Sequence, residues 1–138
     1  MPGQVSIVVI DDNASALKLL AAALERDGLN VYTALHPEEG MAIVREHRPS
    51  LVVTDLVMPG MSGNDLVAHI KQISPATPVI LFSGQVKMYD QNTLADIFLP
   101  KGMYSVAELL ERIRLLLVHK RGPKRAVVPV RLPRASGS

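Results

Sequence analysis

The chain has 138 residues, contains no cysteine, is 48% hydrophobic and carries a formal charge of +2. This length fits one domain with its own core, and the absence of cysteine excludes thiol nucleophiles, disulfides and cysteine-ligated metal sites. The four histidines lack metal-ligand spacing, which disfavours a zinc enzyme. Neither a signal peptide nor a membrane-spanning stretch is evident, so we expect a cytoplasmic protein without membrane contact.

Short apolar runs alternate with amphipathic segments along the chain. The first half predicts, in order, strand Val5–Ile10, helix Ala14–Arg26, strand Asn30–Leu35, helix Pro37–Glu46 and strand Leu51–Thr54. The second half predicts helix Asn64–Ile73, strand Val79–Phe82, strand Asp96–Leu99 and a final helix that begins at the capping box Ser105–Glu108. This alternation predicts an α/β fold: a flavodoxin-like, doubly wound, five-stranded parallel sheet of order 2-1-3-4-5 with helices on both faces.

Polar side chains follow the predicted strands at their carboxyl ends. Asp11 and Asp12 follow the first strand, Asp55 the third, Ser83 the fourth and Lys101 the fifth. In this strand order the first and third strands are neighbours, so three carboxylates crowd together, and a divalent cation such as Mg²⁺ or Mn²⁺ would relieve their repulsion. A nearby lysine suits an incoming phosphoryl group. Neither glycine-rich nucleotide motif occurs, which disfavours a nucleotide as the phosphoryl donor.

Four segments in this order resemble the response regulator receiver domain of two-component signalling: Val9–Asn13, Asp55–Gly63, Leu81–Gly84 and Phe98–Lys101. The resemblance covers about residues 4–118, which we take as the receiver domain. It implies that Asp55 accepts a phosphoryl group from a phosphohistidine of a sensor histidine kinase or a histidine phosphotransfer protein. It further implies that Asp11, Asp12, Asp55 and the backbone carbonyl of Val57 hold Mg²⁺.

The same resemblance implies a switch. Lys101 would pair with the phosphoryl group, Ser83 would move to donate a hydrogen bond to it, and Phe98 would change rotamer into the vacated space. Such a protein catalyses its own phosphorylation and dephosphorylation but acts on no separate substrate. Its output would be binding to a downstream protein or onward relay of the phosphoryl group. The oligomeric state is left open.

Three features depart from the family pattern. Gly102 follows Lys101 where the family usually has proline, and serine at position 83 is a common alternative to threonine. Ser83 and Lys101 are closer in sequence than usual by about one helical turn. We therefore expect the fourth helical segment, Gln85–Ala95, to be short or irregular, and we expect that the chain does not use the family's common dimer in its standard form. In this family the side chain two positions after the acceptor overlooks the phosphoryl group. The resemblance thus implies that valine at position 57 cannot orient an attacking water, which predicts slower dephosphorylation than in a Val57→Asn variant.

Residues 119–138 differ in composition from the rest of the chain. Nine of the 15 basic residues and all 13 acidic residues precede residue 119, so the body carries a charge of −4 and this tail +6. We expect a flexible tail, too short to form an output domain of its own. Because it has no aromatic residue and no recognition-helix pattern, contact with nucleic acid is disfavoured but kept as an alternative. A second alternative is a receiver-like binding module that is never phosphorylated. A D-x-D aspartate phosphatase fits the adjacent Asp11–Asp12 pair poorly.

Overall fold

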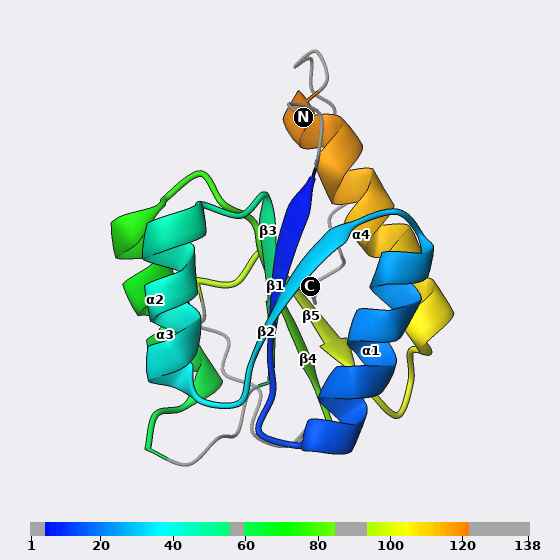
Figure 1. Ribbon diagram of the computed structural model, residues 1–138, viewed down its shortest axis with the longest axis horizontal. Coiled ribbons are helices and arrows are strands. Elements are labelled where there is room, and N and C mark those ends of the chain that lie inside the picture. Colours follow the sequence, from blue (N-terminus) through cyan, green and yellow to red (C-terminus); the bar gives the residue numbers. More distant parts are fainter. Residues whose placement is uncertain (1–4, 56–59, 85–93, 122–138) are drawn as a thin grey trace, which may run out of the picture.

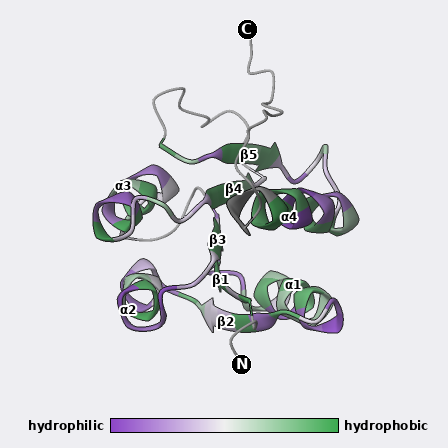
Figure 2. Cartoon of the chain, turned by 90° about the horizontal axis from the view of Figure 1, so that it is seen from above, coloured by the Kyte–Doolittle hydropathy of each residue, from purple (hydrophilic) through white to green (hydrophobic). Residues whose placement is uncertain are grey.

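The computed structural model describes residues 5–55, 60–84 and 94–121. Within these ranges the elements follow in the order β1 (Ser6–Ile10), α1 (Ala14–Arg26), β2 (Asn30–Ala34), α2 (Pro37–His47), β3 (Leu51–Thr54), α3 (Gly63–Ile73), β4 (Val79–Ser83), β5 (Ile97–Pro100) and α4 (Val106–Arg121). All the strand pairs are parallel, and the sheet order is β2-β1-β3-β4-β5. Helices α2 and α3 cover one face of the sheet and α1 and α4 the other (Figures 1 and 2). The predicted fold class is confirmed.

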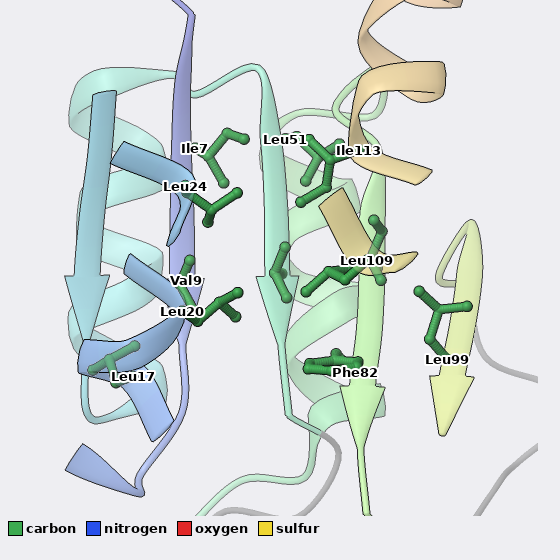
Figure 3. Packing of buried hydrophobic residues seen from close by; sticks show 12 residues of the cluster. Ile7, Val9, Leu17, Leu20, Leu24, Leu51, Phe82, Leu99, Leu109 and Ile113 are labelled. Atoms are coloured by element: carbon green, nitrogen blue, oxygen red, sulfur yellow. The ribbon is translucent and has the colours of Figure 1, made fainter. Parts of the chain in front are cut away.

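The sheet separates two apolar clusters, because alternate side chains of a strand point to opposite faces. Ile7 and Val9 of β1 belong to the cluster under α1 and α4, whereas Val8 and Ile10 belong to the cluster under α2 and α3. These four side chains are at most 1% exposed. Figure 3 shows the first cluster. Burial on both faces explains why the central strands appear in the sequence as continuous apolar runs.

Local signals fix the ends of the helices, and therefore the positions of the loops at the carboxyl edge of the sheet. The side chain of Asn13 accepts a hydrogen bond from the backbone N–H of Ala16 and caps α1. Gly28 ends the turn after α1 with a φ of +90°, a conformation that glycine adopts readily. The predicted capping box is present, since Ser105 and Glu108 each accept a hydrogen bond from the other's backbone N–H.

Gly40 lets helix α2 lie unusually close to strand β1. A Cβ atom added at this glycine would stand 2.4 Å from Cδ1 and 2.8 Å from Cγ1 of Ile10. Ile10 is fully buried, and the next residue, Asp11, is the first residue beyond β1. The packing of α2 thus reaches the strand end that supplies the predicted site.

Polar contacts join elements that are distant in sequence. Lys71 Nζ donates to the Thr77 carbonyl at 2.7 Å and to Asp96 Oδ2 at 2.9 Å, and the same carboxylate oxygen accepts from the Val79 N–H at 2.7 Å. Arg114 of α4 makes two hydrogen bonds to the carboxylate of Asp27, which follows α1. These bonds raise the pKa of the Arg114 guanidinium.

Several predicted element boundaries differ from the structure by one residue: β1 begins at Ser6, β2 ends at Ala34, α2 ends at His47, α3 begins at Gly63, β4 ends at Ser83 and β5 runs over Ile97–Pro100. Strand β5 begins at Ile97 and not at Asp96, because the Asp96 N–H and carboxylate bind the start of β4 without joining the strand ladder proper. Helix α4 continues through Arg121, three residues beyond Val118. The expectation of a short or irregular segment at Gln85–Ala95 lies largely outside the described residues, as does most of the predicted tail. Among the described residues, no helix is long and apolar enough to cross a membrane.

Candidate functional site

Three carboxylates meet at the carboxyl edge of the sheet, as the strand order predicts. One oxygen from each of Asp11, Asp12 and Asp55 lies within 4.8 Å of the other two. β1 and β3 are hydrogen-bonded neighbours, and the Asp55 N–H donates to the Ile10 carbonyl at 3.1 Å. Asp11 is buried, Asp55 is half-buried and Asp12 is exposed. The cluster is therefore held by the backbone on its inner side and open to solvent on its outer side.

Asp11 is held in place by hydrogen bonds at both carboxylate oxygens. Its Oδ1 accepts from the backbone N–H of Asn13 at 2.9 Å, and its Oδ2 accepts from Lys101 Nζ at 3.1 Å. Its own N–H donates to the Ala34 carbonyl at the end of β2. Since the residue is only 6% exposed, these bonds offset the cost of burying its charge.

Lys101 brings a positive charge to this acidic edge from the other end of the sheet. Its backbone N–H donates to the Ser83 carbonyl at 2.8 Å, which fixes the start of its side chain beside the end of β4. Its ammonium group is ion-paired with Asp11 and also lies 5.5 Å from the centre of the Phe82 ring. The loop that follows turns tightly, because the N–H groups of Met103 and Tyr104 both donate to the Pro100 carbonyl.

Ser83 and Phe98 lie on neighbouring strands. Ser83 ends β4 and is fully buried, and Phe98 of β5 is half-buried. In the strand pairing Phe98 is opposite Leu81, two residues before Ser83 on β4. Leu81 belongs to the cluster under α2 and α3, and Phe98 packs against the same cluster. Residues two apart on a strand share a face, so Ser83 and Phe98 lie on the same side of the sheet.

Of the seven predicted site residues, five lie together at one edge, Phe98 lies within β5 and one is outside the described residues. Asp11, Asp12, Asp55 and Lys101 are joined by the contacts above, and Ser83 adjoins Lys101 through the backbone. Val57, whose carbonyl was predicted as a metal ligand, lies outside the described residues. The contact of Lys101 with the ring of Phe82 was not anticipated. The only sign of this contact in the sequence is an aromatic residue, Phe82, directly before Ser83. In the strand pairing, Phe82 is opposite Leu99, two residues before the lysine.

The donor set fits a hard divalent cation. Three carboxylates within 4.8 Å of one another carry more negative charge than the single ammonium group of Lys101 balances, and oxygen ligands open to water are those that Mg²⁺ and Mn²⁺ prefer. Together with the parallel sheet of order 2-1-3-4-5, this places the acidic cluster where doubly wound domains bind their ligands, beyond the carboxyl ends of the strands.

Comparison with known proteins identifies the class. The model of the response regulator receiver domain family matches residues 7–114, and the chain belongs to this family. A receiver domain structure from Clostridium thermocellum is 31% identical to this chain, with a TM-score of 0.77, and covers 85% of this chain and 97% of its own. The response regulator TrrA of Thermotoga maritima, solved in complex with Mg²⁺ and BeF, is 26% identical with a TM-score of 0.76, over 82% of this chain and 99% of its own.

The curated relatives are longer than this chain. A protein-glutamate methylesterase/protein-glutamine glutaminase of Nitratidesulfovibrio vulgaris is 34% identical over an alignment of 141 positions, which covers 92% of this chain but 38% of that protein. The response regulator ArlR of Staphylococcus aureus is 27% identical over 128 residues, 90% of this chain and 57% of that protein. The chain thus spans half or less of the length of several curated relatives that it matches, with shares of 50%, 38% and 19% for three of them.

Proposed function

We propose that Asp55 accepts a phosphoryl group and that this modification switches the domain between two binding states. The observation that carries the proposal is the convergence of the Asp55 carboxylate with Asp11 and Asp12 within 4.8 Å, beside an ammonium group ion-paired to Asp11. A carboxylate nucleophile, a metal-binding acidic cluster and a cation for the developing charge are the parts that phosphoryl transfer needs. Membership of the receiver family supports the same reading.

The proposed donor is a phosphohistidine of a sensor histidine kinase or of a histidine phosphotransfer protein, since receiver domains generally receive phosphoryl groups from histidine kinases. An oxygen of Asp55 attacks phosphorus, and an O–P bond forms as the N–P bond of the phosphohistidine breaks. The imidazole nitrogen keeps the bonding electron pair and is free to take up a proton. Asp55 is then an acyl phosphate.

The acidic pair Asp11 and Asp12, with Asp55 and the carbonyl of Val57, would hold Mg²⁺ or Mn²⁺ in this reaction. The bound cation would offset the repulsion between the incoming phosphoryl oxygens and the carboxylates. The similar TrrA structure, solved with Mg²⁺ and BeF, supports this assignment. Asp11 is already fixed by its bonds to Asn13 and Lys101, so its position requires little reorganisation when the cation binds.

The phosphoryl group adds a charge close to −2 to the edge of the sheet. The ammonium of Lys101 pairs with this charge, and the hydroxyl of Ser83 donates a hydrogen bond to a phosphoryl oxygen. Movement of Ser83 opens space on the side of the sheet that it shares with Phe98, whose ring turns inward. Each of these contacts exists only when the phosphoryl group is present. Phosphorylation therefore shifts the population toward the conformation that makes them. The changed surface then binds a downstream protein.

Intact-mass spectrometry with acetyl phosphate and Mg²⁺ tests this proposal. We expect one added phosphoryl group on the wild-type protein, loss of it in Asp55→Asn, and its retention in Asp65→Asn. Asp65 is a matched control because it lies in the first turn of α3 and is not part of the carboxylate cluster. Modification that persists in Asp55→Asn would refute the assignment of the acceptor. A complete absence of modification would favour the unphosphorylated binding module.

A further inference from the structure

The side chain of Lys101 must reach from the end of β5 to the carboxylates at the acidic edge. Its backbone is fixed at the end of β5 by the bond to the Ser83 carbonyl, while its ammonium group reaches Asp11, which follows β1. The next residue, Gly102, has no side chain, and a Cβ atom there would meet nothing within 4 Å. Gly102 therefore does not restrict the side chain of Lys101, which is long and has many rotamers.

Phe82 offers a fixed surface under this side chain. The ammonium nitrogen lies 5.5 Å from the centre of the ring, within the range of a cation–π contact. The ring is 7% exposed and belongs to the cluster that includes Leu99 and Leu109 (Figure 3). Figure 3 places it near the carboxyl end of β4, on the same side of the sheet as these leucines. Because the surrounding core holds the ring, its position does not depend on Lys101.

The two contacts of the ammonium group act in combination. Asp11 attracts it by charge, and the negative face of the Phe82 ring attracts it from the core side. The lysine side chain is 31% exposed, so both attractions act in a partly water-excluded place. Phe82 and Ser83 are adjacent on β4 and point to opposite faces of the sheet, so the ring holds Lys101 on the side away from Phe98.

We propose that Phe82 is a positioning residue for Lys101: its ring holds the ammonium group at the acidic edge, ready to meet the phosphoryl group. The inference rests on the proposed function for its catalytic consequence, but the placement of the ammonium group is a property of the unmodified protein. The alternative is that Phe82 serves only as a core side chain.

Proton NMR of the unmodified protein tests the placement directly. The methylene protons next to the Lys101 ammonium should be displaced upfield by the ring current of Phe82, and Lys101→Met identifies their signals. We expect the displacement to disappear in Phe82→Leu, which keeps apolar bulk, and to remain in Phe82→Tyr, which keeps a ring. Leu109→Val is the control, because it weakens the same cluster without removing the ring. Absence of the displacement in the wild-type protein would overturn the proposal.

The rate of phosphorylation by acetyl phosphate tests the consequence, in a double-mutant cycle of Phe82→Leu and Lys101→Met. With lysine at position 101, Phe82→Leu should slow phosphorylation by about twofold to fivefold, the loss expected for one cation–π contact. With methionine there, Phe82→Leu should have no further effect. Equal slowing in both backgrounds would mean that Phe82 acts only through the core. If the wild-type protein takes no phosphoryl group, the proposed function fails, whereas the NMR displacement still decides the placement of Lys101.

Discussion

Replacing Gly40 with alanine puts a methyl group at the closest approach of helix α2 to strand β1. The new Cβ would stand 2.4 Å from Cδ1 and 2.8 Å from Cγ1 of Ile10, both inside the contact distance of carbon atoms. Ile10 is fully buried among the side chains under α2 and α3, so its γ-branch has little room to move. Helix α2, strand β1 or the Ile10 side chain must therefore shift.

The expected magnitude follows from two opposed effects. Overpacking of a well-packed core costs about 1–3 kcal/mol. Replacing glycine by alanine inside a helix regains about 1 kcal/mol of helix propensity. Because two Ile10 atoms are too close and not one, we take the upper part of the overpacking range, and we expect Gly40→Ala to lower the free energy of unfolding by about 1–2 kcal/mol.

A second substitution removes the nearer of the two clashing atoms. Ile10→Val lacks Cδ1, the atom nearest to the added methyl group, and on its own should cost about 1 kcal/mol. The double variant should then be no less stable than Gly40→Ala alone, which corresponds to a coupling of about 1 kcal/mol between the two positions. Urea unfolding of the wild-type protein, both single variants and the double variant measures this coupling, and similar m-values would show that the unfolded state is unchanged.

Two outcomes would refute the reasoning. Additive effects within about 0.5 kcal/mol would mean that the two side chains do not meet. A Gly40→Ala variant that is more stable than the wild-type protein by the full propensity gain of about 1 kcal/mol would mean that Ile10 moves aside without cost.

Three further predictions concern the acidic edge, the start of β4 and α4. With the metal chelated by EDTA, Asp12→Ala should raise the free energy of unfolding, because it removes like-charge repulsion. Added Mg²⁺ should raise the thermal midpoint of the wild-type protein more than that of the variant. An equal rise in both would exclude Asp12 as a ligand. Asp96→Ala removes the acceptor of two hydrogen bonds at a partly exposed place and should cost about 1 kcal/mol in urea unfolding; no loss would mean that water replaces the carboxylate. Ser105→Ala breaks the capping box of α4 and should also cost about 1 kcal/mol, whereas Ser15→Ala, at an exposed position inside α1, should cost little.

Most of the fold could be predicted from the sequence because its signals are local. Runs such as Leu51–Thr54 are apolar and β-branched since the sheet buries them on both faces, and the bounds of that strand and of Ala14–Arg26 agree with the prediction. Asp96 was assigned to a strand on its position in the run, but its hydrogen bonds to Val79 make it an anchor ahead of the strand. Only the fold shows which atoms an aspartate at a strand start will meet.

The candidate site was predictable as a set of residues but not as a set of contacts. Strand order alone brings Asp11, Asp12 and Asp55 to one edge, and the structure confirms their proximity. That Lys101 pairs with Asp11, and that its ammonium group lies over Phe82, depends on side-chain directions across three strands. The roles of Asp55, Ser83 and Phe98 in switching stay predictions.

The ion pair between Lys101 and Asp11 joins residues 90 positions apart in the chain. Loop closure over such a separation is entropically costly, and contacts of this kind form only when the intervening strands are in place. A folding intermediate that has paired β1 with β3 would already hold all three carboxylates, yet it would have no ammonium group beside them. Under the proposed function, the positive charge that pairs with the phosphoryl group would therefore join the acidic cluster only when β5 docks, after the three carboxylates are already together.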